Sequence, residues 1–192
     1  FFLPRATDAS AAATIVDLYK NRLPRSYGDG ALSDIQVISP SKRGEAGTEN
    51  LNLLLQRALN PPAPEKDEHV YRDTTFRTGD RVMQVRNNYE LEWERGGARG
   101  MGVFNGDIGV IRKISKAGSY MEVEFDDRLV VYNFSLLDDL EHAYAITVHK
   151  RQGSEYPIVI MPACSAPPML LTRNLLYTAI TRAQRMVIIV GR

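Results

Sequence analysis

The sequence is poor in the residues that build disulfides and metal centres. It has one cysteine among 192 residues, Cys164, which has no second thiol in the chain to pair with. The histidines His69, His142 and His149 lie far apart and lack the spacing of a zinc motif. We therefore expect no intrachain disulfide, no metal site and no cofactor that is required for folding.

Long apolar runs are absent as well. The most hydrophobic stretch, 158–171, is interrupted by Pro162, Pro167 and Pro168 and does not fit a membrane-spanning helix. No basic leader precedes an apolar run, so the pattern of a signal peptide is missing too. We expect a cytoplasmic protein with no membrane partner, and we expect both ends of the chain to be cut from a longer polypeptide.

Neither sign of charge is in excess, since 24 basic residues face 23 acidic residues and the formal net charge is +1. Proteins held on nucleic acid by bulk electrostatics usually have a strong basic surplus, so any such contact here must be local. The short basic clusters Lys42-Arg43 and Lys150-Arg151 are typical of solvated surface unless a motif surrounds them.

The N-terminal and C-terminal parts of the chain have alternating helix and strand patterns, as in an α/β domain. Apolar residues at helical spacing follow Thr7 and Asp8, either of which can cap a helix start, and short β-branched runs alternate with further helical patterns. The expected elements are a helix over 8–23, a strand over 35–39, a helix from Thr48, strands over 143–148 and 158–161, a helix over 173–183 and a strand over 186–190.

The middle of the chain has a different rhythm, with short strand candidates separated by turn residues. In the clearest candidate Met121, Val123 and Phe125 alternate with acidic residues, which is typical of an antiparallel strand with one wet face. The other candidates are 80–86, 108–114 and 129–134. We predict an α/β domain over 1–78 and 138–192, with a small antiparallel β-barrel and its flanking strands inserted over 79–137.

Two segments carry patterns that packing alone does not explain, T-V-H-K-R-Q-G-S-E over 147–155 and N-L-L-Y-T-A-I-T-R-A over 174–183. They resemble motifs V and VI of the C-terminal motor domain of superfamily 1 DNA helicases, most closely the RecD and TraA branch that includes exodeoxyribonuclease V alpha subunits. The stretches 36–47, 79–88 and 105–109 are similar to further family motifs in the same order. The resemblance covers essentially the whole chain and implies a RecA-like domain with an inserted SH3-like barrel.

The resemblance implies that Arg182 is an arginine finger. Phosphoryl transfer depends on stabilising charge on the transferred oxygens, and a guanidinium stays protonated and can grip two of them. On the predicted helix 173–183, Arg182 lies on the flank of the apolar stripe, from which it can reach an interface. The alternative is a surface arginine that caps the C-terminus of the helix.

Motif V implies two roles. Gly153 and Glu155 would face the nucleotide, because glycine lets the backbone approach a phosphate and a carboxylate can accept hydrogen bonds from ribose hydroxyls. Thr147, His149 and Lys150 would bind the DNA backbone. The alternatives are a surface histidine and a solvated acid.

Other DNA contacts are implied for Lys42 and Arg43, which follow a strand, and for Asn87 and Asn105 in the inserted barrel. A solvated loop is the alternative for the basic pair, and turn geometry is the alternative for the asparagines. The aromatic residues Tyr89, Trp93 and Phe104 are candidates for stacking on bases, although core packing is the favoured interpretation of Phe104.

The sequence has no phosphate-binding loop of the type G-x-x-x-x-G-K-[ST] and no strand that ends in paired acids. ATP and Mg²⁺ would therefore act in the intact enzyme, with the Mg²⁺ held by an N-terminal motor domain of the same polypeptide. The resemblance implies a 5′–3′ helicase or translocase that acts on single-stranded DNA in repair and recombination. Without the N-terminal motor domain, the chain would be inactive as an ATPase. Other nuclease-helicase subunits are further candidate partners. The rivals are a non-catalytic DNA-binding or adaptor module and, third, a complete small nucleotide-binding enzyme.

Overall fold

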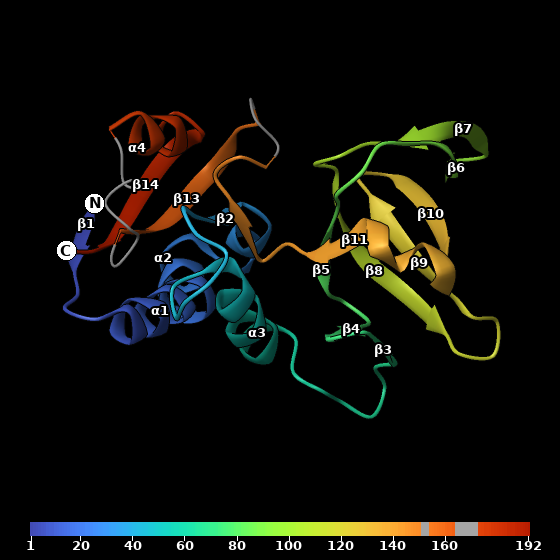
Figure 1. The fold of residues 1–192 in the computed structure, drawn as a ribbon, viewed down its shortest axis with the longest axis horizontal. Coiled ribbons are helices and arrows are strands. Elements are labelled where there is room, and N and C mark those ends of the chain that lie inside the picture. The colour runs from blue at the N-terminus through green and yellow to red at the C-terminus, as the bar shows by residue number, and fades with distance from the viewer. Residues whose placement is uncertain (151–153, 164–172) are drawn as a thin grey trace. The chain divides into compact units, whose positions relative to one another are not determined.

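The computed structural model describes residues 1–150, 154–163 and 173–192 of the chain. These residues form two compact units (Figure 1). The α/β unit consists of Phe1–Leu59 and Tyr144–Arg192, and the β unit consists of Asn60–Ala143. The β unit therefore begins earlier and ends later than the insertion predicted over 79–137.

The α/β unit is built on a five-stranded parallel sheet with the order β1-β14-β13-β2-β12. Every residue of the inner strand β2 is buried, as expected for a parallel strand covered on both faces. Isoleucine and valine dominate β2 and β13, so the apolar runs that predicted strands do form the middle of the sheet. The strands are β1 (Phe2–Pro4), β2 (Ile35–Ser39), β12 (Ala145–Thr147), β13 (Tyr156–Ala163) and β14 (Ala183–Gly191).

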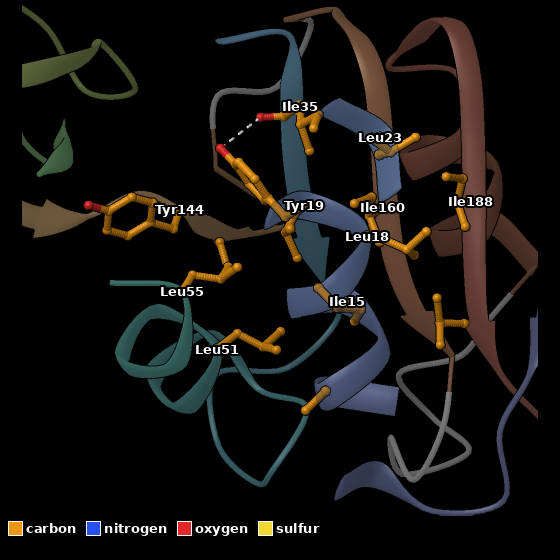
Figure 2. Close-up of a cluster of buried hydrophobic side chains, with 14 of the residues drawn as sticks. Ile15, Leu18, Tyr19, Leu23, Ile35, Leu51, Leu55, Tyr144, Ile160 and Ile188 are labelled. Atoms are coloured by element: carbon orange, nitrogen blue, oxygen red, sulfur yellow. Dashed lines mark hydrogen bonds between the residues drawn. The ribbon is translucent and has the colours of Figure 1, made fainter. Parts of the chain in front are cut away.

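One face of this sheet is covered by the helices of the N-terminal part of the chain. Figure 2 shows Ile15 and Leu18 pointing toward Ile160 and Ile188 of the sheet, with Leu51 of α3 in the same cluster. The hydroxyl of Tyr19 donates a hydrogen bond to the carbonyl of Ile35, at 3.3 Å. The helical elements are α1 (Asp8–Asp17), η1 (Leu18–Arg22), α2 (Leu23–Tyr27), η2 (Asp29–Ser33), α3 (Thr48–Leu59) and α4 (Arg173–Ile180).

The first helix is not continuous as predicted over 8–23. It starts at a capping box in which the hydroxyls of Thr7 and Ser10 each bind the other residue's backbone N–H. After Asp17 it passes through one π-helical segment, and a new α-helix begins with Pro24 in its first turn. Proline lacks the N–H that a helix interior requires, so a helix start is where it fits best. No helix within the described ranges is both long and apolar enough to cross a bilayer.

The β unit contains a seven-stranded antiparallel sheet with the order β11-β5-β8-β9-β10-β6-β7. The predicted fold class, a RecA-like α/β domain with an inserted small antiparallel β-domain, is thus confirmed. Closure of that insertion into a barrel is not found, because no pairing joins β7 to β11 in the described part of the chain. The elements are β3 (Glu68–Tyr71), β4 (Thr74–Arg77), β5 (Arg81–Gln84), β6 (Asn88–Arg95), β7 (Ala98–Val103), β8 (Ile108–Ser115), β9 (Tyr120–Phe125), β10 (Arg128–Asn133), η3 (Phe134–Asp139) and β11 (Leu140–His142).

The core of the β unit follows the predicted alternation. Met121, Val123 and Phe125 are at most 1% exposed, while the residues between them are half-buried. The hydroxyl of Tyr132 donates to the buried Oε1 of Gln84, at 2.7 Å. The sequence did not predict β3, β4, β6, β7 and β11. Charged residues in β6 and glycines in β7 hide the strand pattern of those two.

A fully buried carboxylate, Asp80, ties together the two ends of the β unit. Its oxygens accept hydrogen bonds from the side chain of Asn60 and the backbone N–H of Arg77, each at 2.8 Å, and Oδ2 lies 2.8 Å from Nε2 of His142. Burial alone would raise the pKa of Asp80. The hydrogen bond and charge of His142, with those further hydrogen bonds, outweigh it and hold the pKa below its ordinary value.

Replacing this carboxylate should weaken the β unit in a pH-dependent way. Because the pKa of Asp80 is lower in the folded than in the unfolded chain, its contribution is present above about pH 4 and is lost as the pH falls through the folded-state pKa. We expect Asp80→Asn to lower the free energy of unfolding by about 3 kcal/mol at neutral pH and to flatten its acid dependence. Urea unfolding followed by the fluorescence of the single tryptophan, Trp93, measures this.

The matched control is Asp127→Asn, which changes an exposed carboxylate in the turn between β9 and β10. An Asp80→Asn protein that kept the wild-type acid dependence would show that the carboxylate is not the group that links stability to pH.

Candidate nucleotide and nucleic-acid site

The strand-contact candidates lie at the carboxyl ends of two neighbouring parallel strands. Thr147 ends β12 and is paired in register with Ser39, which ends β2. Val148 continues the contact, since its N–H donates to the carbonyl of Ser39 at 3.2 Å. The structure therefore brings the loop after β2 and the start of motif V to the same edge of the sheet, where ligands bind in many open α/β sheets.

Hydrogen bonds within the loop after β2 fix its backbone, and the side chains of its two basic residues, Lys42 and Arg43, are exposed to solvent. The hydroxyl of Ser39 donates to the carbonyl of Ala46 at 2.9 Å, and the carbonyl of Lys42 accepts the N–H of Glu49 at 3.1 Å. The side chains of Lys42 and Arg43 are both exposed, and neither forms an ion pair with another described residue. A fixed backbone with exposed cations suits the binding of a phosphate backbone.

Motif V places its side chains alternately after β12. Val148 is buried, His149 is exposed, and Thr147 and Lys150 are half-buried. The N–H of Lys150 donates to the carbonyl of Thr147 at 3.0 Å, which closes a turn. Thr147 and His149 therefore stay available at the carboxyl edge of the sheet.

The nucleotide candidates lie at the opposite edge of the sheet. Because β12 and β13 are parallel, the chain must return to the amino end of the sheet before β13 begins. Glu155 lies there, is exposed, and accepts a hydrogen bond from the side chain of Gln184 at 3.4 Å. Gly153 lies outside the described residues.

Arg182 is not on a helix, in contrast to the prediction of a helix over 173–183. Helix α4 ends at Ile180, and Arg182 lies in the turn before β14, where its N–H donates to the carbonyl of Ala179 at 3.2 Å. The helix ends early because the next residues turn into the edge of the sheet, where the N–H of Tyr156 binds the carbonyl of Arg182 at 2.7 Å.

The side chain of Arg182 is also buried, at 3% exposure, whereas we expected it on the flank of a helix from which it could reach an interface. Its Nη1 donates to the carbonyl of Lys150 at 2.8 Å, and its Nη2 is buried without a hydrogen-bond partner in the described structure. Burial lowers the pKa of Arg182 from its ordinary value. The hydroxyl of the neighbouring Tyr156 is likewise buried and without a partner there.

The arrangement thus joins motif V to motif VI. Segments about 30 residues apart in sequence meet through the contacts of Arg182 with Lys150 and Tyr156 and of Gln184 with Glu155. The sequence did not predict the contact between Tyr156 and Arg182, because an aromatic residue at the start of a strand is typical of the hydrophobic core. Within the described ranges, no three acidic, histidine or cysteine side chains come together in a way that could hold a metal ion.

Asn87 and Asn105 belong to the β unit and lie beside each other at one end of its sheet. The backbone N–H of Asn105 donates to Oδ1 of Asn87 at 2.9 Å, and both residues are exposed. Phe104, favoured as a core residue, is instead 40% exposed, whereas Trp93 is half-buried with the guanidinium groups of Arg95 and Arg128 within 6 Å of its ring centre at 5.7 and 5.9 Å.

Two family comparisons match consecutive parts of the chain. Residues 51–125 match the SH3 domain of ATP-dependent RecD-like DNA helicases, and residues 142–190 match the UvrD-like helicase C-terminal domain. The chain belongs to the RecD-like helicase family. The motifs V and VI and the inserted β-domain therefore have the family context that the sequence predicted.

Individual relatives agree with the assignment. The ATP-dependent RecD2 DNA helicase of Deinococcus radiodurans is 36% identical over 82% of this chain, and the RecBCD enzyme subunit RecD of Mycolicibacterium smegmatis is 30% identical over 83% of it. The matched regions are 19% and 26% of those proteins, so the chain corresponds to a minor part of their length.

Solved structures share the fold at low identity. A Pif1 helicase chain from a study of forked double-stranded DNA matches with a TM-score of 0.53 and 17% identity over 96% of this chain and 47% of that one. A Bacteroides Pif1 helicase in complex with ADP-AlF3 and single-stranded DNA matches with a TM-score of 0.52 and 16% identity over 91% and 44%.

The loop that carries Lys42 and Arg43 depends on a glycine with no room for a side chain. A Cβ at Gly47 would lie 2.3 Å from the carbonyl oxygen of Arg43. We expect Gly47→Ala to cost about 1–3 kcal/mol of stability and to displace the loop, because backbone atoms would have to move. Calorimetry and the amide NMR shifts of residues 41–43 measure both effects.

Gly30→Ala is the control, since a Cβ at Gly30 would meet nothing within 4 Å. Equal effects of the two substitutions would mean that the close contact at Gly47 does not determine the loop conformation.

Proposed function

We propose that this chain supplies the C-terminal motor half of an ATP-dependent 5′–3′ DNA helicase or translocase. In this proposal an N-terminal motor domain of the same polypeptide holds ATP and Mg²⁺, and this chain contributes Arg182 and contacts to the single strand. The observation that carries the proposal is the hydrogen bond from Arg182 to the carbonyl of Lys150, which joins motif VI to motif V.

The environment of Arg182 supports its role as the arginine finger. A buried guanidinium is costly unless it is paired, and here its partners in the described structure are a carbonyl group and no anion. A triphosphate oxygen would supply the missing negative charge and accept a hydrogen bond from Nη2. To reach it, Arg182 would exchange its contact with Lys150 for one with the phosphate.

The two edges of the sheet support a division of labour. Glu155 and Arg182 would face the nucleotide with Gly153, while Thr147, His149, Lys150, Lys42 and Arg43 would hold the DNA backbone. Motif V connects the two edges of the sheet. A change in the contact between Arg182 and Lys150 would therefore shift the residues that neighbour Lys150 in the sequence. ATP would favour a closed arrangement of the two motor domains, and hydrolysis would release it. The two domains would then alternate in binding the strand tightly.

The arginine assignment is tested in the longer protein that contains this chain and a motor domain with a phosphate-binding loop. We expect Arg182→Ala to lower kcat of DNA-stimulated ATP hydrolysis by about a thousandfold or more, with a much smaller change in nucleotide affinity, because the finger acts on the transition state. Arg182→Lys should not restore the rate, since an ammonium lacks the two-pronged geometry.

Arg185→Ala is the matched control, because Arg185 is an exposed arginine three residues further along the chain. Normal DNA-stimulated ATPase in the Arg182→Ala protein would contradict the finger assignment and favour a non-catalytic DNA-binding or adaptor module. The chain by itself is expected to hydrolyse no ATP.

The phosphate contacts are tested by the salt dependence of single-strand binding to this chain. Each phosphate neutralised should contribute a slope of about −0.7 to a plot of log K against log salt concentration for a single strand. We expect the double substitution Lys42→Ala/Arg43→Ala to make the slope less steep by one to two such increments. A slope equal to that of the wild type would place the strand away from this loop.

A further inference from the structure

Two aromatic side chains in the β unit are exposed, whereas three other large rings of the same unit are fully buried. Tyr89 is 68% exposed and Phe104 is 40% exposed, whereas Phe76, Phe125 and Tyr132 are at most 1% exposed. The rings of Tyr89 and Phe104 touch edge to face, with centroids 5.5 Å apart. The pair is therefore one exposed aromatic surface formed by two separate strand ends.

The backbone is shaped to hold these rings outward. Gly102 has φ +107, and a Cβ there would lie 2.8 Å from Cζ of Phe104, so that ring lies against the backbone of β7. In the pairing of β6 with β7 the register shifts between Asn88 and Glu92, which leaves Tyr89 in an irregular segment. Such bulges redirect side chains and are common near functional sites.

Polar residues that suit a sugar-phosphate chain lie close to the two rings in the sequence, and the carboxylate of Asp107 accepts a hydrogen bond from the N–H of Phe104 at 2.9 Å. Arg86 has a side chain that is 67% exposed, and its Nε lies 3.8 Å from Asp139, too far for a hydrogen bond. Asn87 and Asn105 flank the rings, and the hydrogen bond between them fixes the two loops together. Glu90 is the acidic residue next to Tyr89 in the sequence, and its N–H binds Oδ1 of Asn88 at 3.0 Å.

We propose that Tyr89 and Phe104 form a stacking surface for unpaired bases of a single nucleic-acid strand, with Arg86 beside them for a phosphate. This inference rests on the proposed function, and it assigns to the β unit a contact with the bases rather than with the backbone. Base stacking is tolerant of sequence because every base has an aromatic face, so the site should have little sequence preference. A duplex hides its base faces and should bind this surface poorly.

A protein ligand fits the surface less well. The neighbours of the two rings in the sequence include the amide residues Asn88 and Asn105. The exposed apolar residues Met101 and Val131 lie on strands next to β6, whose Glu90, Glu92 and Glu94 are exposed acids. An aromatic pair beside hydrogen-bonding groups and a cation is instead typical of single-strand binding.

The test uses this chain with a fluorescent oligothymidylate and with an oligonucleotide of the same length in which the bases are replaced by abasic sites, measured by anisotropy. We expect Tyr89→Leu and Phe104→Leu each to weaken oligothymidylate binding about tenfold, while leaving binding of the abasic strand unchanged. Tyr89→Phe should retain wild-type affinity because the ring remains. Tyr27→Leu, which removes a tyrosine of α2 that is 57% exposed, is the matched control.

The outcomes separate this inference from the proposed function. If oligothymidylate binds and Lys42→Ala/Arg43→Ala weakens it, but the ring variants bind as well as wild type, the stacking surface is refuted while the strand-binding role stands. Equal losses for the base-containing and abasic strands would also refute stacking. If the wild-type chain binds no strand even at low salt, the strand contacts of the proposed function fail together with this site, and self-association through the rings in sedimentation would explain their exposure.

Discussion

A guanidinium removed from water links motif V to motif VI in the α/β unit. Arg182 is almost fully buried, and in the described structure it meets the carbonyl of Lys150 rather than a carboxylate. Burial lowers the pKa of Arg182, and a carbonyl dipole compensates a buried cation only in part. In the proposed function, an anion would be a stronger partner for this guanidinium than the carbonyl that binds Nη1.

The direction of the strands in the parallel sheet determines which segments lie close to the guanidinium of Arg182. Since β12, β13 and β14 run in the same direction, the turn that precedes β14 and the end of motif V arrive at one edge, while the loop after β2 and Thr147 lie at the other. In the proposed function, the order of the strands would place the nucleotide contacts and the DNA contacts at opposite edges of the sheet.

Sequence patterns predicted most of this architecture where burial and periodicity agree. The buried runs of β2 and β13 and the alternation of Met121, Val123 and Phe125 were sufficient, and the family motifs identified the segments that meet at the sheet edges. The patterns failed where tertiary contacts override local preference. The end of α4 depends on the backbone contact between Tyr156 and Arg182, and β6 is a strand despite its charges because it pairs with β10 and β7. The burial of Arg182 and the exposure of Phe104 are likewise set by neighbours distant in sequence, which a single-chain pattern does not contain.

The hydrogen bonds of Asp80 with Asn60 and His142 have a consequence for how the chain folds. Strands β2 and β12 pair in the α/β unit, yet the whole β unit, Asn60–Ala143, lies between them in the sequence. Closing such a long unstructured segment costs chain entropy and slows the formation of distant contacts. Once the β unit is folded, Asn60 and His142 are both bound to Asp80, and its two ends leave the insertion close together. An insertion that folded first would therefore turn this remote strand pairing into a nearly local one, because its two ends would already be close together.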